Sequence, residues 1–147
     1  MKIVINKITS QKELEDCLNI RLQVFVNGQN VSLEEEIDGK DKESEHYLLK
    51  VEGRPVGVAR VRFIDKDAKI ERVAILESLQ NKGLGKQLMN AIIEDLKQNS
   101  ELQNARLGSQ THAIPFYERL GFIVCSEEYM DAGIPHKDMY YPFNNVA

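Results

Sequence analysis

Apolar residues recur along the chain in two patterns that predict its secondary structure. Stretches in which apolar residues alternate with polar ones, or run together, are typical of β-strands. Seven stretches of this kind lie at residues 2–8, 46–53, 54–65, 68–76, 104–110, 122–130 and 136–143. Apolar residues three and four positions apart predict helices after Ser10, over 84–100 and within 114–122. This order predicts an α/β (α+β) fold with helices on both faces of a mixed, mostly antiparallel sheet.

The first helix has a recognisable start and a predicted buried face. Ser10 is a typical N-cap residue, and Glu13 three positions later completes a capping box. Gly28 is expected to end the helix in a left-handed conformation. Four apolar residues at nearly helical spacing predict the face that packs on the sheet: Leu14, Leu18, Leu22 and Phe25.

The connections between the predicted strands constrain the sheet. Gly53, Arg54 and Pro55 separate two apolar runs and predict a hairpin, and the run at 68–76 extends it to an antiparallel meander. The helix over 84–100 would then cross over to the strand at 104–110, which makes that strand parallel to its predecessor.

Composition and charge exclude several classes of protein. A chain of 147 residues is expected to form one domain, 1–147. Its net charge of −4 argues against a nucleic-acid partner, and it carries neither an apolar run of membrane-spanning length nor a signal-peptide core, so a cytoplasmic location is expected. Cys17 and Cys125 lie far apart, which favours two buried, unpaired thiols over a redox or metal site, and no metal is expected.

The stretch QNKGLGKQLM places Gly83 and Gly85 immediately before a predicted helix. The first N–H groups of a helix have no partner within it, and glycines allow a phosphate to approach the backbone closely. The stretch lacks both the P-loop pattern and the third glycine of the dinucleotide fingerprint. Taken alone, it is as compatible with a structural turn as with a phosphate site.

Two flanking motifs give this stretch a specific context. QNKGLG follows the strand ERVAI and precedes QTHAIPFYERLGF. In this order and spacing, the three motifs resemble the GNAT superfamily of acyl-CoA-dependent N-acyltransferases over nearly the whole chain. The stretches RLQVFVNGQNVSLEEEID and MDAGIPHKDM are similar to its ElaA/YjcF-like branch.

The resemblance implies a site for acetyl-CoA as co-substrate. The loop that would hold the diphosphate comprises Gln80, Asn81, Lys82, Gly83, Leu84, Gly85 and Lys86, although both lysines are also compatible with plain surface positions. Val73, Ala74 and Ile75 would pair through their backbone with the pantetheine arm, so the sheet should splay between the fourth and fifth strands. An N–H near Val73 would polarise the thioester carbonyl. Further neighbours of the cofactor would be Gln110, Phe116 and Arg119.

The resemblance also implies catalytic groups. Tyr117 matches the tyrosine that protonates the departing thiolate, and its alternative interpretation is a core aromatic. Glu71 is the first candidate for the base, because strand alternation would put it on the face of Val73 and Ile75. It could instead form an ion pair with an arginine of the neighbouring strand. His136 is the second candidate, and a structural role in a turn is open for it as well.

The acceptor pocket is expected beside the first helix. Arg21, Phe25 and Gln29 recur every four residues and would share one helical face, although Phe25 also suits the core. The acidic residues that follow are compatible with a solvated loop or with a lip that attracts a cationic amine: Glu34, Glu35, Glu36 and Asp38.

The predicted function is acetyl transfer from acetyl-CoA to a primary amine of a small molecule, by direct attack. The chain shows no pattern of a Ser-His-Asp triad. Cys125 is the one residue for which a role as a covalent nucleophile stays open. The alternatives are a CoA-binding sensor without turnover and an acetyltransferase of protein or peptide amines. A homodimer stays open.

Overall fold

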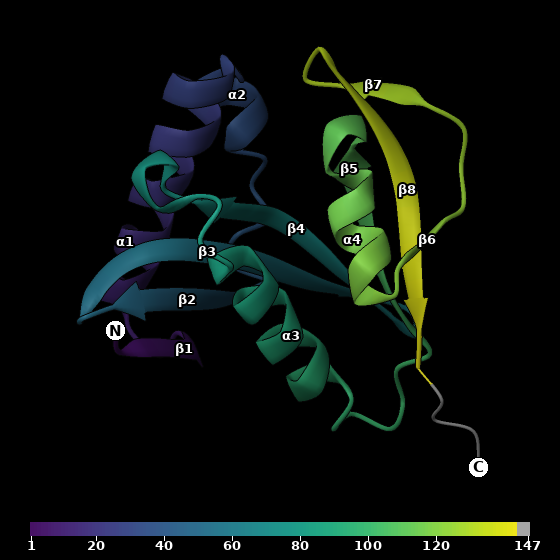
Figure 1. Cartoon of the computed structure of the whole chain (residues 1–147), viewed down its shortest axis with the longest axis horizontal. Helices are drawn as coiled ribbons and strands as arrows, with labels where there is room; N and C mark the ends of the chain where they lie inside the picture. Colours follow the sequence, from purple (N-terminus) through teal and green to yellow (C-terminus); the bar gives the residue numbers. More distant parts are fainter. Residues whose placement is uncertain (144–147) are drawn as a thin grey trace.

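The computed structural model describes residues 1–143, in which eight strands form one twisted sheet (Figure 1). The last four residues of the expected domain, 144–147, lie outside the described residues. The strands are β1 (Ile3–Lys7), β2 (Glu45–Val51), β3 (Arg54–Ile64), β4 (Asp67–Ile75), β5 (Asn104–Gln110), β6 (Ile123–Val124), β7 (Tyr129–Asp131) and β8 (Ile134–Pro142).

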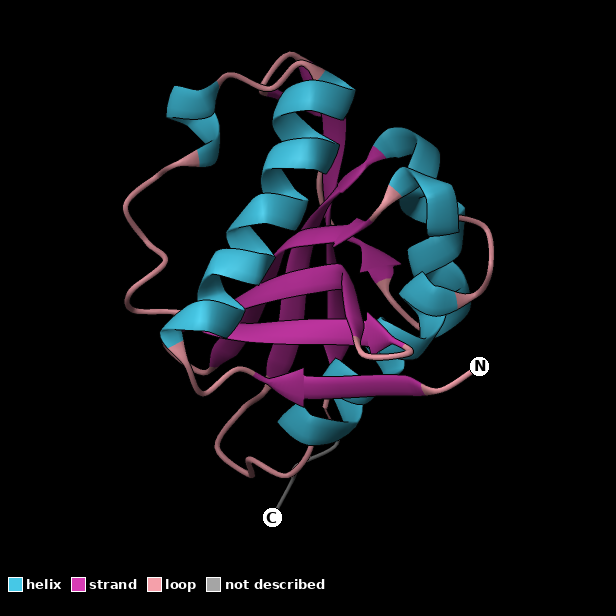
Figure 2. Cartoon of the chain, turned by 90° about the vertical axis from the view of Figure 1, so that its left-hand side faces the viewer, coloured by secondary structure: helices cyan, strands magenta, loops and turns pink. Residues whose placement is uncertain are grey.

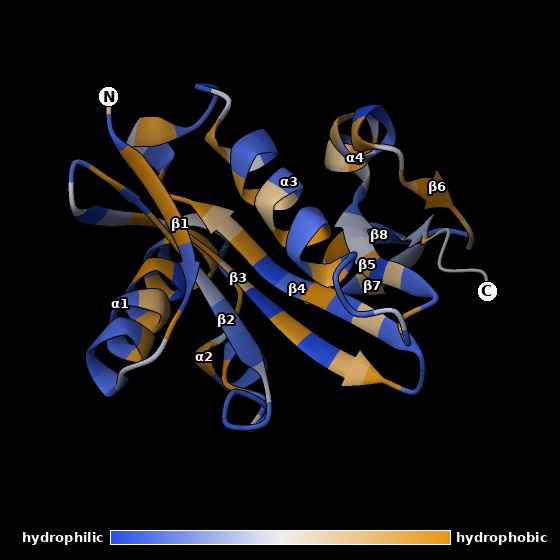
Figure 3. Ribbon diagram, turned by 90° about the horizontal axis from the view of Figure 1, so that it is seen from below, coloured by the Kyte–Doolittle hydropathy of each residue, from blue (hydrophilic) through white to orange (hydrophobic). Residues whose placement is uncertain are grey.

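Helices cover both faces of this sheet, as predicted (Figure 2). They are α1 (Gln11–Arg21), the π-helix η1 (Leu22–Asn27), α2 (Leu33–Glu36), the 3₁₀ turn η2 (Glu77–Leu79), α3 (Leu84–Leu96), the 3₁₀ turn η3 (Thr111–Ala113) and α4 (Ile114–Leu120). Figure 3 shows α1 and α2 on one face and α3 and α4 on the other. Within the described part of the chain, no helix combines the length and apolarity needed to cross a membrane.

The strand order confirms the predicted mixed sheet. β1 to β4 are antiparallel neighbours, and β4 is parallel to β5, as expected for a crossover through α3. Pairing between β4 and β5 is confined to Asp67–Lys69 and Asn104–Arg106, and beyond these residues the two strands diverge. The sheet is therefore splayed at this point, and the divergence creates the space in which the site lies.

The hairpin between β2 and β3 confirms the predicted turn. Glu52 and Gly53 both adopt a positive φ, 51° and 78°. Two consecutive left-handed residues match the right-handed twist of the strands that they join.

The first helix starts as predicted but packs through another face. Ser10 caps it by accepting a hydrogen bond from the Glu13 N–H. Leu18 and Leu22 are exposed, so the predicted apolar stripe is wrong. The helix buries a different set, spaced by three and four residues, that includes a thiol and a guanidinium: Cys17, Ile20 and Arg21.

The predicted end of this helix is also wrong. Gly28 has a φ of −90°, in the right-handed region, and the left-handed residue is Asn30 with a φ of 56°. The helix does not stop at the glycine, because its last part, Leu22–Asn27, widens into a π-helix that carries the chain further. An asparagine tolerates the left-handed conformation better than most residues, so it can take the role expected of the glycine.

The strand predicted at 122–130 is two short strands, β6 and β7. The Ser126 Oγ accepts a hydrogen bond of 2.8 Å from the Asp138 N–H, which occupies a position in the ladder that a backbone carbonyl would otherwise take. The chain leaves the sheet here and rejoins it at Tyr129. Cys17 is buried and Cys125 is exposed, so the expectation of two buried thiols holds for the first only.

Candidate active site

A cleft of about 370 Å³ occupies the gap between the diverging strands β4 and β5. One wall consists of β4, η1 and α2, and the other of β5, α4 and the β7–β8 hairpin. Of the residues predicted for the site, this cleft brings together Phe25, Gln29, Glu71, Val73, Ala74, Ile75, Gln80, Gln110, Tyr117 and His136. Residues that are 111 positions apart in sequence thus meet in one cavity.

A β-bulge in β4 decides which of its side chains face the α3 side of the sheet. Arg72 has a φ of 55°, and the register with β3 shifts by one residue at this point. Val73 and Ile75 pack on the α3 side of the sheet, whereas Ala74 packs on the α1 side. Because the extra residue reverses the alternation, Glu71 lies on the α1 side with Ala74. The prediction that it shares a face with Val73 and Ile75 is wrong.

The start of α3 has the geometry of an anion site. Gly83 is left-handed, with a φ of 78°, and the first internal bond of the helix runs from the Gln87 N–H to the Gly83 carbonyl. The N–H groups of Leu84, Gly85 and Lys86 therefore have no partner within the helix. A Cβ on Gly85 would lie 3.5 Å from the Phe116 ring, so α4 packs directly against this turn. At Gly83 the backbone is open, since a Cβ there would meet nothing within 4 Å, and the unpartnered N–H groups fit an anion such as a diphosphate.

The other loop residues differ in what they can offer. The Leu84 side chain is buried in the core, so only its backbone faces the loop. Gln80 is held in place by a 2.9 Å hydrogen bond from its Nε2 to the Ile75 carbonyl. Lys82, Lys86 and Arg119 are exposed, and none of the three has an ion pair within the described residues. Their roles toward CoA stay predictions.

Tyr117 lines the cleft from α4 and is half-buried. Its ring packs edge-on against Phe116 and Phe122, with centroids 5.0 and 5.8 Å away. Both interpretations of this residue thus have support, since its ring belongs to the core and its side chain reaches the cleft. Burial raises the pKa of Tyr117 to about 12, which keeps the phenol protonated throughout the physiological range.

The opposite wall carries a residue that the sequence did not single out. The Tyr129 ring stacks on the His136 ring at 5.9 Å and 22°, and its hydroxyl donates a 2.5 Å hydrogen bond to Asp138. A Cβ on Gly108 would lie only 2.5 Å from that hydroxyl oxygen. The glycine in the middle of β5 therefore makes room for Tyr129, and a glycine inside a predicted strand was the one signal of this close approach.

The three residues predicted to share a face of the first helix separate in the structure. Phe25 and Gln29 line the cleft, and Gln29 accepts a 2.8 Å hydrogen bond from Gln110 on the opposite wall. Arg21 is 1% exposed and does not reach the cleft lining. The π-helix explains the difference, because its wider turns rotate Phe25 and Gln29 away from the line expected at four-residue spacing.

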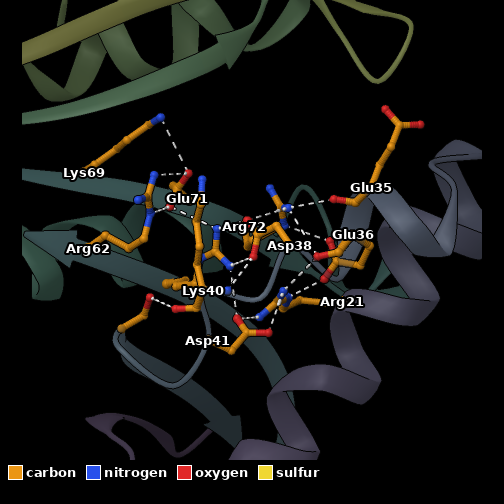
Figure 4. Close-up of polar contacts among 12 residues, drawn as sticks. Arg21, Glu35, Glu36, Asp38, Lys40, Asp41, Arg62, Lys69, Glu71 and Arg72 are labelled. Atoms are coloured by element: carbon orange, nitrogen blue, oxygen red, sulfur yellow. Dashed lines mark hydrogen bonds and ion pairs between the residues drawn. The ribbon is translucent and has the colours of Figure 1, made fainter.

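Arg21 instead belongs to an arginine–carboxylate network beneath the cleft (Figure 4). The Asp41 Oδ1 bridges Arg21 and Arg60 at 2.7 and 3.1 Å. Arg60, which is fully buried, also binds Asp38 with both of its terminal nitrogens, at 2.9 and 2.8 Å. The network holds the segment around α2 against the sheet.

Two further carboxylates join the network at the cleft wall. Glu36 contacts Arg21 Nε at 2.5 Å and Arg72 Nε at 2.8 Å. Glu71 is surrounded by three cations, with Arg62 at 2.5 Å, Arg60 at 3.0 Å and the Lys69 ammonium at 3.6 Å. The alternative predicted for Glu71, an ion pair with an arginine of the neighbouring strand, is therefore observed.

The network lowers the pKa values of its acidic groups. The hydrogen bonds from Arg60 hold the pKa of Asp38 far below its usual range. Burial alone would raise the pKa values of Asp41 and Glu71, but hydrogen bonds and charge from the arginines outweigh it, and both are lowered. These carboxylates are ionised near neutral pH.

The acidic run after the first helix divides into two pairs. Glu36 and Asp38 are taken up by the network, and Glu34 and Glu35 are exposed. Glu35 lines the cleft, and on the other wall Asp131 is an exposed carboxylate of the lining. Neither of these two has an ion-pair partner among residues 1–143.

No group of His, Cys, Asp and Glu among residues 1–143 is arranged to hold a metal ion.

Comparison with known proteins decides the family. Residues 7–142 match the family model described as "Acetyltransferase (GNAT) domain". The chain belongs to the GNAT acetyltransferases. It is 41% identical over 140 residues to "Uncharacterized N-acetyltransferase YjcF" of Bacillus subtilis, covering 95% of this chain and 98% of that protein.

ElaA of Escherichia coli supports the same branch of the GNAT family. It is 34% identical over 135 residues, 88% of each chain. Its crystal structure superposes with a TM-score of 0.86 at 30% identity, covering 95% of this chain and 99% of that one. A more distant structure, a Bacillus subtilis acetyltransferase in complex with CoA, shows the shared fold with a TM-score of 0.74, 21% identity and coverage of 97% of this chain and 99% of that one. The resemblance to the ElaA/YjcF-like branch is confirmed, and the protein is an acyltransferase.

Proposed function

We propose that the protein transfers the acetyl group of acetyl-CoA to a primary amine of a small molecule, by direct attack and with Tyr117 as the general acid. The observation that carries this proposal is the cleft between β4 and β5, whose lining includes Tyr117 and Gln80, the first residue of the loop that leads into α3. In this arrangement the α3 N–H groups bind the diphosphate, and the backbone of Val73–Ile75 aligns the pantetheine arm.

The direct mechanism needs a proton donor and a polarised carbonyl. The Val73 N–H donates to the thioester oxygen as negative charge develops there. As the C–S bond breaks, the Tyr117 hydroxyl gives its proton to the sulfur. Because burial raises the pKa of Tyr117 to about 12, the phenol always arrives protonated.

The size and charge of the cleft favour a small acceptor. The cleft volume of about 370 Å³ is near the lower end of the range for small-molecule sites, ~300 to ~1,000 Å³, and the acceptor shares it with the pantetheine arm. The cations Arg72 and Lys69 in its wall are engaged by Glu36 and Glu71, while the carboxylates Glu35 and Asp131 have no cation bound within the described chain. The free charge at the rim is thus negative and attracts an ammonium group.

The decisive experiment mixes the protein with acetyl-CoA and a panel of polyamines, amino sugars, amino acids and short peptides. Free CoA should be measured by chromatography, because the exposed Cys125 would react with a thiol reagent. Turnover with one or more small amines supports the proposal. Tight CoA binding without turnover favours a sensor, and turnover restricted to peptides favours a protein acceptor.

A further inference from the structure

We infer that His136 is the base that takes the proton from the acceptor ammonium, and that Glu71 is not. This inference rests on the proposed acetyl transfer and assigns one more residue of the same cleft. An alkylamine arrives protonated near neutral pH, and only its neutral form can attack a thioester. The cleft therefore needs a group that is neutral at that pH and has a lone pair directed at the amine.

The surroundings of His136 leave one ring nitrogen free for this purpose. Its Nδ1 lies 2.7 Å from the Ile134 carbonyl oxygen, which can only accept, so Nδ1 carries the hydrogen. In the neutral ring, Nε2 is then the lone-pair nitrogen. Within residues 1–143, Nε2 has no hydrogen-bond partner, although the side chain is only 9% exposed and lines the cleft.

The ring is also held in its orientation. Tyr129 stacks on its face, and the Tyr129 hydroxyl is fixed by Asp138. His136 is paired with Gln110 on β5 and with Tyr129 on β7, so backbone ladders anchor it on both sides. A base that is fixed by its strand, a carbonyl and a stacked ring loses little entropy when the amine arrives.

Glu71 has the opposite properties. Three cations, Arg60, Arg62 and Lys69, contact its carboxylate. Protonating it would leave Arg62 and Lys69 without their carboxylate partner and would weaken the charge balance around the buried Arg60, which is costly. Glu71 therefore acts in the network that supports β4 and does not exchange a proton during turnover.

The proton balance is as follows. The ammonium gives one proton to His136 Nε2, and the freed lone pair forms the C–N bond at the thioester carbon. The C–S bond then breaks, and the sulfur takes the proton of Tyr117. The second proton on the new amide nitrogen restores the Tyr117 hydroxyl, and His136 releases its proton to solvent. One proton is produced for each amine acetylated.

The test compares the pH dependence of kcat/KM in the His136→Gln variant with that in the wild type. The acceptor is the best small amine of the acetyl-transfer panel. The titratable groups on elements that pack against this end of β8 are Tyr129 and Asp131 on β7 and His112 on η3. His112 lines the same cleft and is exposed, so His112→Gln is the matched control. In the wild type and the control, kcat/KM should rise with pH through an inflection as the base loses its proton.

In His136→Gln that inflection should disappear, and kcat/KM at pH 7 should fall by ~10². The loss of kcat/KM relative to the wild type should shrink to less than ~10-fold at pH 9.5, because a larger share of the amine is already neutral at that pH. A structural role predicts an equal loss at both pH values. The affinity for CoA should stay within about twofold, since no predicted CoA contact is removed.

The inference is overturned if His136→Gln keeps the inflection, if its deficit does not depend on pH, or if His112→Gln alone loses the inflection. Should the variant fail to fold, nitrogen NMR of the wild-type histidines decides: a neutral His136 with its hydrogen on Nε2 contradicts the inference. Failure of the proposed function looks different, because the wild type itself would then acetylate no small amine.

Discussion

Gln29 and Gln110, 81 positions apart in sequence, connect the two walls of the cleft by a hydrogen bond of 2.8 Å. The Gln110 amide nitrogen at the end of β5 donates to the Gln29 amide oxygen beyond the π-helix. We predict that Gln29→Ala and Gln110→Ala each lower kcat/KM by about fivefold, which corresponds to one hydrogen bond of ~1 kcal/mol. The double variant should lose no more than either single one. Losses that multiply in the double variant would mean that the two residues act separately.

The arginine–carboxylate network should make the protein sensitive to acid. Asp38, Asp41 and Glu71 have lower pKa values in the folded protein than in the unfolded chain. On acidification the unfolded chain binds protons first, so the free energy of unfolding should fall as the pH drops below about 4. Urea unfolding at a series of pH values measures this.

The variant Asp38→Asn tests the same network at neutral pH. It leaves the buried Arg60 without its two-point partner and should cost about 3 kcal/mol at pH 7. Its unfolding free energy should then depend less on pH between 5 and 3. The control, Glu43→Gln, removes an exposed carboxylate and should change neither quantity. If the unfolding free energy of Asp38→Asn depended on pH between 5 and 3 as strongly as that of the wild type, the network would not be the source of the acid sensitivity.

Tyr117→Phe removes the proposed acid while keeping the ring that packs on Phe116 and Phe122. We predict a fall in kcat of ~10² with CoA affinity nearly unchanged. Because burial raises the pKa of Tyr117 to about 12, the wild-type rate should not decline on the alkaline side up to pH 10. An alkaline decline near pH 8 or 9 that the variant abolishes would contradict this environment for the phenol.

Gly85→Ala should separate stability from cofactor binding. Its Cβ would meet the Phe116 ring at an ordinary distance of 3.5 Å, and alanine favours the helix by up to ~1 kcal/mol. CoA affinity should nevertheless fall, because the methyl group narrows the space between the Phe116 ring and the α3 N–H groups that we propose bind the diphosphate. Gly83→Ala, in contrast, should lower stability by ~1 kcal/mol because of its φ of 78°. Unchanged CoA affinity in Gly85→Ala would place the diphosphate elsewhere.

Glu35 and Asp131, the two rim carboxylates that have no cation partner within the described residues, should affect charged acceptors only. Glu35→Gln and Asp131→Asn should each raise KM for a diamine severalfold, and the effect should weaken at high salt. For an amine without a second charge the change should be small. An equal rise in KM for both acceptors would indicate a loss of shape instead of a loss of attraction.

Much of the fold was predictable because it depends on local patterns. The alternation in β2, β3 and β8 is visible along the chain, and the run from β4 through α3 to β5 already implies the parallel pair. The glycine loop and Tyr117 were recognisable from short motifs. All of these features are encoded by residues that are close together in sequence.

The features that the sequence did not reveal depend on distant partners. The packed face of α1 includes Arg21, which counts as an exposed residue in any apolar pattern, and its burial makes sense only with Glu36 and Asp41 beside it. The bulge at Arg72 is equally hidden, because an arginine gives no sign of a positive φ. The place of Tyr129 over His136 depends on space left by Gly108 on another strand.

The bulge at Arg72 also limits how the strand can vary. Before this residue odd-numbered positions face the α1 side, as Glu71 does, and after it they face the α3 side, as Val73 and Ile75 do. Deleting one residue there would exchange the two faces of the end of β4 and place the Ala74 side chain on the side where Val73 and Ile75 now pack. Insertions and deletions should therefore be tolerated in the exposed turn at Glu52 but not in β4. The number of residues in β4 determines which side chains line the cleft, so the length of this strand is itself a requirement of the site.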